Sequence, residues 1–112
     1  MPTEGPYYVA GKFTAPDPEG IARNVARACA AGSRLAGEGL EVIVPHVAVP
    51  KHFSWDEAMI VCKALLMSCR TIALLPGWQE SRGARQEHEW AVAAGLGVVY
   101  LPECYCSLAE AA

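Results

Sequence analysis

Short apolar runs alternate along the chain with longer segments in which apolar residues recur every three or four positions. Each run is four or five residues long and is closed at once by glycine or proline, which is typical of buried strands. The runs that predict strands span residues 7–10, 41–44, 71–75 and 97–101. The longer segments predict helices over about 18–37, 54–69 and 81–94. A serine or aspartate at the start of each can cap a helix.

Strands and helices therefore alternate from the first strand to the fourth. Continuous apolar strands separated by helices favour a parallel sheet that is covered on both faces. Right-handed crossovers then give a three-layer α/β/α doubly wound domain, flavodoxin- or Rossmann-like, with four to five strands. In such folds ligands bind outside the carboxyl ends of the strands. We therefore expect the site near residues 11–14, 45–46 and 76–81 of a single domain over 1–112.

Three details of the segments outside the strands lead to further expectations. Arg23, Arg27 and Arg34 lie opposite the apolar stripe of the first helix and are interpreted as solvated. The second helix is apolar most of the way round, which favours a subunit interface and hence a homodimer or higher homo-oligomer. The segment after residue 44 is expected to be a loop, and residues 106–112 to form one helical turn or fray.

Composition removes several classes of protein. The 112 residues include 9 Lys or Arg and 12 Asp or Glu, 53% are hydrophobic, and the net charge is -3. The high hydrophobic content argues against a disordered chain, and the negative net charge argues against a nucleic-acid polymer as partner. No apolar run approaches the roughly 20 residues of a membrane span. The first residues lack a signal-peptide pattern, and the five cysteines are interpreted as reduced thiols, so we expect a cytoplasmic protein. We also expect no metal and no cofactor.

One carboxylate falls on the buried side of the third predicted helix. Residues 84, 87, 91, 94 and 95 share an arc of about 100°, and all of them except Glu87 are alanine or glycine. A buried charge costs several kcal/mol unless it is paired or hydrogen-bonded. Glu87 therefore has either a structural partner, with Arg82 or Arg85 as candidates, or a chemical task. A rim position is the third interpretation.

Other candidate residues allow two interpretations each. His46 lies at a strand end, whereas His52 and His88 favour a surface or loop position. Cys62 and Cys69 fall on a helical core stripe and favour packing. Trp78 either stacks on a planar ligand or covers the core. Lys12 and Arg82 either bind a phosphate or are surface charges.

Two motifs resemble a known superfamily. Residues 8–11, Y-V-A-G, resemble the Y-[IV]-A-G-P opening of the nucleoside 2-deoxyribosyltransferase-like superfamily. Residues 75–87 resemble the L-P-G-W-x-x-S-R-G-A-x-x-E signature of one branch, which consists of small, mostly uncharacterised bacterial and phage proteins. Further matches to that branch are Asn24, Leu35, Gly39, Pro45, His46, Ala91 and Gly95.

The resemblance implies an enzyme that exchanges or hydrolyses the N-glycosidic bond of a nucleoside or nucleoside monophosphate. Glu87 matches the superfamily's nucleophile, which forms a covalent glycosyl-enzyme. The loop after the first strand would contact the sugar or its 5′ group, and Phe13 or Trp78 would contact the base. A partner chain would complete the site. The predicted substrate-binding residues are Gly11, Lys12, Phe13, His46, Gly77, Trp78, Ser81, Arg82, Gly83 and Ala84.

The sequence also departs from the superfamily pattern. The aspartate that helps to protonate the leaving base would fall at Cys62, and a thiol is a poor substitute for a carboxylic acid there. Lys12 replaces a proline, and Arg70 an aspartate. Two alternatives to the enzyme therefore stay open. One is a catalytically impaired nucleotide-binding module on the same fold, and the other is a dimeric structural or interaction protein.

Overall fold

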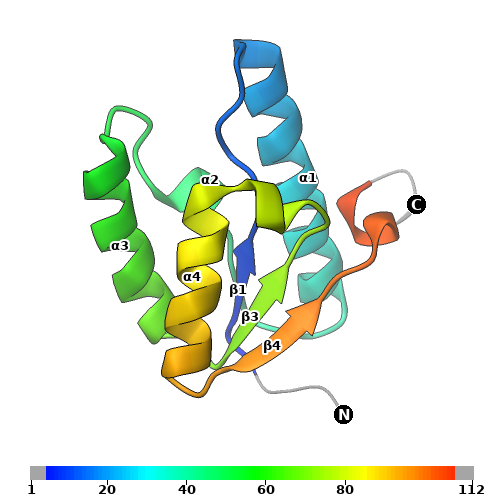
Figure 1. Cartoon of the computed structure of the whole chain (residues 1–112). Helices are drawn as coiled ribbons and strands as arrows, with labels where there is room; N and C mark the ends of the chain where they lie inside the picture. Colours follow the sequence, from blue (N-terminus) through cyan, green and yellow to red (C-terminus); the bar gives the residue numbers. More distant parts are fainter. Residues whose placement is uncertain (1–4, 108–112) are drawn as a thin grey trace.

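The computed structural model describes residues 5–107 and contains one parallel sheet (Figure 1). Its strands are β1 (Tyr7–Ala10), β2 (Val42–Ile43), β3 (Thr71–Leu74) and β4 (Gly97–Tyr100), in the spatial order β2-β1-β3-β4. All three pairings are parallel. This is the strand order of flavodoxin-like folds, in which the switch point lies between the first and third strands. The predicted fold class is confirmed, with four strands.

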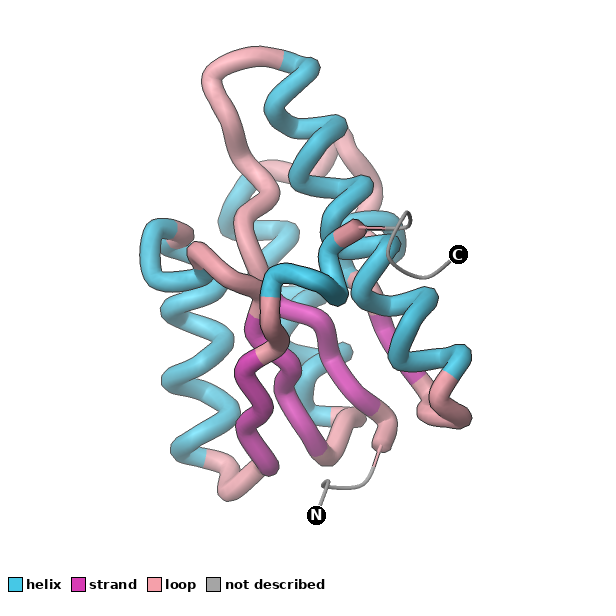
Figure 2. The backbone as a smooth tube through the Cα atoms, turned by 90° about the vertical axis from the view of Figure 1, so that its right-hand side faces the viewer, coloured by secondary structure: helices cyan, strands magenta, loops and turns pink. Residues whose placement is uncertain are grey.

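Helices cover both faces of the sheet (Figure 2). Helix α1 (Pro18–Gly37) packs on one face, and α3 (Trp55–Met67) and α4 (Arg82–Ala93) pack on the other. The crossover from β1 to β2 runs in one direction across the sheet, and the crossovers from β2 to β3 and from β3 to β4 run in the other. Right-handed connections that run in opposite directions place their helices on opposite faces.

The three long helices begin where their caps predict. Asp17 accepts a hydrogen bond from the backbone N–H of Gly20 at 2.7 Å and is followed by a proline. Ser54 and Glu57 form a reciprocal capping box, and Ser81 accepts from the N–H of Ala84 at 3.1 Å. Each cap satisfies a backbone donor that the first turn leaves without a partner.

Alternation along β1 divides the interior into two cores. Tyr7 and Val9 face α1 and pack with Ala31 and Leu35. Tyr8 and Ala10 face α3 and α4, where they meet a second buried set that includes Met59, Cys62, Leu66, Ile72, Leu74 and Ala91. Successive side chains of a strand point to opposite faces, so adjacent tyrosines belong to different layers.

Short turns of helix occur where the sequence predicts loops. Residues after β2 form α2 (Pro45–Ala48), so the expectation of a loop there is wrong for this turn. Proline at a first helical position has its φ already set and lacks an N–H that would need a partner. Two 3₁₀ turns follow later, η1 (Trp78–Glu80) and η2 (Glu103–Cys106). The helical turn or fraying expected over residues 106–112 falls almost entirely outside the described residues, which end at residue 107.

The predicted buried face of α4 needs correction. Ala94 and Gly95 are exposed, because α4 ends at Ala93 and Gly95 turns the chain away with φ +76°. The buried side of α3 is centred on Cys62, with Met59 and Leu66, and the outer side exposes Ile60 and Met67.

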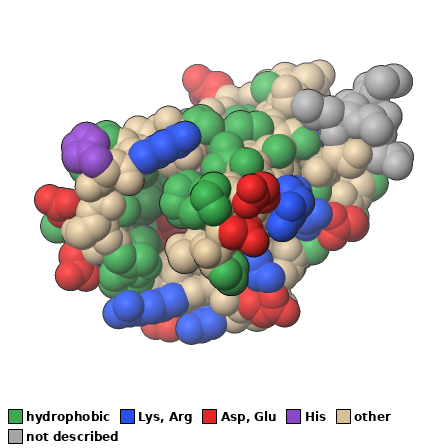
Figure 3. Space-filling model, turned by 90° about the horizontal axis from the view of Figure 1, so that it is seen from above, with side chains coloured by type: hydrophobic (Ala, Val, Ile, Leu, Met, Phe, Trp, Pro, Cys, Tyr) green, Lys and Arg blue, Asp and Glu red, His purple; other side chains and the backbone are tan. Residues whose placement is uncertain are grey.

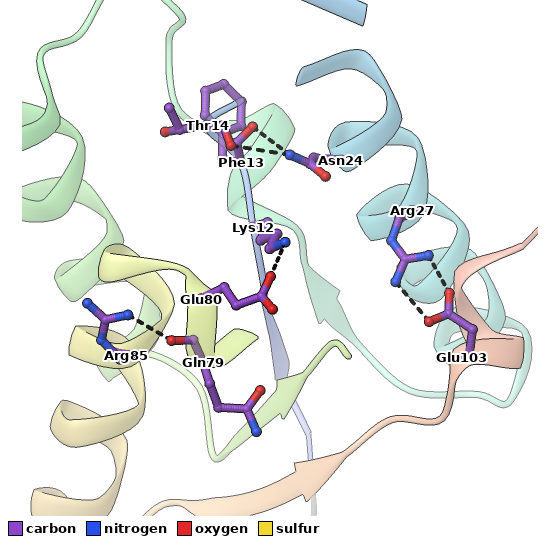
Figure 4. A network of polar contacts seen from close by, with 9 residues as sticks. All are labelled: Lys12, Phe13, Thr14, Asn24, Arg27, Gln79, Glu80, Arg85 and Glu103. Carbon is purple, nitrogen blue, oxygen red and sulfur yellow. Dashed lines mark hydrogen bonds and ion pairs between the residues drawn. The ribbon is translucent and has the colours of Figure 1, made fainter. Parts of the chain in front are cut away.

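Two arginines of α1 were expected to be just solvated, but each also has a protein partner. Arg27 pairs with Glu103 (Figure 4), and Arg34 donates to the Cys104 carbonyl at 3.3 Å. The Arg34 guanidinium also lies 4.3 Å from the centroid of the Tyr105 ring. These contacts fasten η2 to α1. Among the described residues, none of the helices has the length and apolar character needed to cross a membrane.

Candidate active site

A cavity of about 410 Å³ opens beside the carboxyl ends of β1 and β2, between the first turns of α3 and α4. Its size is within the range of small-molecule sites. Figure 3 looks onto this end of the molecule, where hydrophobic side chains gather with acidic and basic side chains beside them. The predicted site residues that line it are Gly11, Lys12, Phe13, His46, Ser81, Arg82, Gly83, Ala84 and Glu87.

Glu87 lies in the wall of this cavity and is only 5% exposed. It belongs to the buried side of α4, between Ala84 and Ala91, whose small side chains let the helix pack close to the sheet. The Tyr8 hydroxyl, in β1, donates a hydrogen bond to Glu87 Oε2. Glu87 therefore has a structural partner and also faces a cavity.

The proposed arginine partners of Glu87 are engaged elsewhere. Arg85 Nη1 donates to the Gln79 carbonyl at 2.7 Å (Figure 4). The Arg82 guanidinium lies 3.8 Å from the centroid of the Trp55 ring. The interpretation of Glu87 as half of an ion pair is therefore wrong, and so is the rim interpretation, because the side chain is buried.

Electrostatics makes Glu87 the group of this wall that titrates near neutral pH. Burial raises the pKa of Glu87 to about 7, against the smaller lowering effect of hydrogen bonds from Tyr8 and Cys62. Burial and the neighbouring Glu87 also raise the pKa of Tyr8 far above its ordinary value, so Tyr8 stays a donor. A carboxyl poised near pH 7 is typical of catalytic acids, bases and nucleophiles.

Cys62 extends from α3 toward the same carboxylate. It is 7% exposed, packs in the core on this face and lines the cavity, so the packing interpretation is confirmed but incomplete. Burial raises the pKa of the Cys62 thiol to about 11. The thiol therefore stays protonated across the physiological range and is neither a nucleophile nor an effective acid.

His46 in α2 also lines the cavity and is 7% exposed. Its Nε2 is 3.0 Å from the Lys12 carbonyl oxygen. A carbonyl only accepts, so Nε2 carries the hydrogen and Nδ1 presents a lone pair. Nδ1 is buried and has no protein partner among the described residues. Burial lowers the pKa of His46, which keeps the ring neutral at pH 7.

The loop after β1 is held from two sides. Asn24 of α1 donates to the Phe13 carbonyl at 3.1 Å, and Lys12 pairs with Glu80 of η1 (Figure 4). These contacts fix the segment that forms one lip of the cavity. Lys12 is therefore engaged in an ion pair across the mouth.

Two predicted substrate-binding residues lie away from the cavity lining. Trp78 packs against His88 and Tyr100, with ring centroids 4.6 and 6.3 Å apart, and covers the core beside α4. Gly77 has φ +87°, a left-handed conformation that favours glycine and turns the chain into η1. Both residues shape the turn that carries Glu80 and do not face Glu87.

Sequence reasoning missed the partner of Glu87 and much of the apolar wall. A tyrosine in a fully buried strand needs a partner for its hydroxyl, and that rule could have marked Tyr8. The wall contributed by Phe53, Trp55 and Met59 had no comparable signal, because apolar residues at a helix start are common. The described residues hold no group of three or more His, Cys, Asp or Glu that could bind a metal ion.

Comparison with protein families identifies the family of this chain. No curated protein matches the chain. The chain belongs to the family described as Domain of unknown function (DUF4406), whose model matches residues 6–100 and so includes Tyr8, Cys62 and Glu87.

Proposed function

We propose that this protein is an N-glycosidic-bond enzyme acting on a nucleoside or nucleoside monophosphate, with Glu87 as its nucleophile. The observation that carries the proposal is a carboxylate that is 5% exposed, faces a cavity at the strand ends and accepts a hydrogen bond from Tyr8. The sequence resemblance to the nucleoside 2-deoxyribosyltransferase-like superfamily supports the same assignment.

The reaction has two steps. An ionised Glu87 oxygen attacks C1′ of the sugar, the C1′–N bond breaks, and its electron pair leaves with the base nitrogen. A second base or a water molecule then attacks C1′, its proton passes to solvent or to the departed base, and Glu87 leaves as a carboxylate. Tyr8 holds Oε2 in place through both steps. Because the pKa of Glu87 is about 7, ionisation is complete only above neutral pH.

The rest of the cavity offers places for the substrate. Polar groups near the first turn of α4, from Ser81 and Arg82, suit the sugar or its 5′ group, as does Lys12 across the mouth. The Phe13 ring is 6.1 Å from the His46 ring and is 37% exposed, so it is available to a base. A cytoplasmic location, and a homodimer formed through the exposed apolar side of α3, are further proposals from the sequence.

The test measures free base by chromatography after incubation with a panel of nucleosides and 5′-monophosphates. We expect Glu87→Gln to lower base release by about 1,000-fold or more, because a neutral amide cannot form the covalent intermediate. Glu89→Gln, one exposed carboxylate on the same helix, is the matched control and should keep wild-type release. Base release that persists in Glu87→Gln would contradict the nucleophile assignment.

A nucleotide-binding module without catalysis is the second candidate. The protonated Cys62 thiol at the position of the superfamily's aspartate favours it. In that case wild-type protein would bind a nucleotide saturably in calorimetry and release no base from any member of the panel.

A further inference from the structure

The walls of the cavity limit which bases can leave. When the C1′–N bond of an ordinary nucleoside breaks, the electron pair makes the base an anion unless an acid protonates it. Such general acids contribute typically about 10²–10⁴-fold to a rate. A base that already carries a positive charge on its ring needs no proton, because the departing pair neutralises it.

Carboxyl groups are scarce around the reaction centre. Among the described residues that line the cavity, the carboxyls are Glu87 and Glu80. Glu80 is paired with Lys12 at the mouth, its side chain is 69% exposed, and the ion pair lowers its pKa. Glu87 cannot serve as acid in the step in which it is the nucleophile.

The other hydrogen-bonding groups near Glu87 do not replace the acid. Burial raises the pKa of the Cys62 thiol to about 11, and the Tyr8 hydroxyl already donates its hydrogen bond to Glu87. The Nε2–H of His46 donates to the Lys12 carbonyl, and its Nδ1 carries no proton. The two remaining cations of the lining, Lys51 and Arg82, are exposed residues.

Aromatic side chains of the same cavity lining suit a planar cation. Phe13, Phe53, Trp55 and Met59 contribute aromatic rings and a thioether. The Arg82 guanidinium already stacks on the Trp55 ring at 3.8 Å from its centroid. Aromatic faces attract cations through their quadrupole.

We infer that the substrate is a nucleoside or its 5′-monophosphate with a positively charged base, either a pyridinium or an N7-alkylated purine. This inference rests on the proposed function. A Glu87 oxygen bonds to C1′ while the C1′–N bond breaks, and the pair neutralises the ring, which leaves as a neutral base. Water then attacks C1′, Glu87 leaves as a carboxylate, and the proton of the water goes to solvent.

The test compares charged and neutral bases on the same sugars. The pairs are 7-methylguanosine with guanosine, and nicotinamide riboside with its uncharged dihydro form, each also as the 5′-monophosphate. We expect wild type to release each cationic base at least about 100-fold faster than its neutral partner, after subtraction of the spontaneous rate. The two pairs distinguish an alkylated purine from a pyridinium as the preferred substrate.

The outcomes separate this inference from the proposed function. Release of neutral and cationic bases at similar rates, lost in Glu87→Gln, would overturn the inference and support the function. Absence of release from every compound would overturn both. A preference for cationic bases that Glu87→Gln abolishes supports both.

A substitution at Cys62 tests the reason for the preference. Cys62→Asp should raise release of neutral bases by about 10-fold or more, because it restores an acid beside the leaving group. Cys62→Ser, which has similar size and no acid, should keep the wild-type preference. Thermal unfolding shows whether both variants are folded, and if Cys62→Asp is not, the wild-type comparison still decides. A folded Cys62→Asp variant that gains nothing on neutral bases would contradict the inference.

Discussion

The two faces of the sheet bury similar apolar side chains and differ in the polar groups among them. On the α1 face, Tyr7 and Val9 meet alanines and leucines, and no carboxylate of residues 5–107 is buried among them. On the α3 and α4 face, Tyr8 donates to the buried Glu87 beside Cys62. A buried ionisable group costs stability, so the α3 and α4 face carries a cost that the α1 face does not, and it holds the proposed nucleophile.

Glu87→Gln should produce the largest stability change, as a gain that depends on pH. Burial places the pKa of Glu87 at about 7 in the folded state, above its ordinary value of 4.5. As pH rises from 4.5 to 7, the Glu87 carboxyl loses its proton in the unfolded chain before it does in the folded protein. The unfolding free energy of wild type therefore falls, by about 3 kcal/mol at pH 8 relative to low pH. The uncharged amide of the variant avoids this cost.

Chemical denaturation at pH 4 and pH 8 checks this expectation. The stability difference between Glu87→Gln and wild type should be near zero at pH 4 and largest at pH 8. Glu89→Gln, exposed on the same helix, should show no such trend. An equal difference at the two pH values would mean that Glu87 does not titrate abnormally.

Gly32→Ala tests the α1 face. A Cβ at Gly32 would lie 2.6 Å from Val44 Cγ2, and valine has little freedom to move aside. We expect a loss of about 1–3 kcal/mol in unfolding free energy from overpacking. Gly37→Ala in the same helix meets no atom within 4 Å and should be neutral or slightly stabilising. If both variants unfold alike, close packing of α1 against Val44 is not the cause.

Tyr8→Phe should affect the titration of Glu87. The Tyr8 hydrogen bond lowers the pKa of Glu87, so its loss raises that pKa and moves the rising limb of a pH–rate profile to higher pH. The unfolding free energy should fall by about 1 kcal/mol. Tyr7→Phe, on the opposite face, should leave the Glu87 titration unchanged. NMR titration of the carboxyl carbon measures it directly, and equal titration curves in the two variants would contradict the assignment.

Glu103→Gln should have the smallest effect. It breaks the ion pair between Arg27 of α1 and η2, whose side chains are 34% and 65% exposed. Exposed pairs contribute about 0.2–1 kcal/mol and are weakened by salt. A double-mutant cycle with Arg27→Gln at low and high salt measures the coupling. A coupling above about 2 kcal/mol would show that η2 is a larger part of the core than we describe.

Local signals in the sequence predicted the elements well. Asp17, Ser54 and Ser81 cap helices because their side chains bond backbone groups within three residues, and such contacts need no distant partner. The end of α4 was less predictable, because Ala94 and Gly95 continue the periodic pattern after the helix has stopped. The arginines of α1 were misjudged for a related reason, since Glu103 and Tyr105 approach them only after the chain has crossed the sheet.

The candidate site was predictable to the same degree. Helical spacing alone placed Glu87 on the buried side, and most of the predicted substrate-binding residues line one cavity. Spacing could not tell that Trp78 faces away, because a single 3₁₀ turn decides its direction.

The sequence by itself determined the alternation of strands and helices, their starts and the inward position of Glu87. These follow from periodicity and capping, which act over a few residues. Only the tertiary structure decided which groups meet Glu87. Tyr8, Cys62 and Glu87 lie on β1, α3 and α4, and parallel pairing of β1 with β3 brings them together. Contacts between segments so distant depend on strand order and helix packing, which local patterns do not encode.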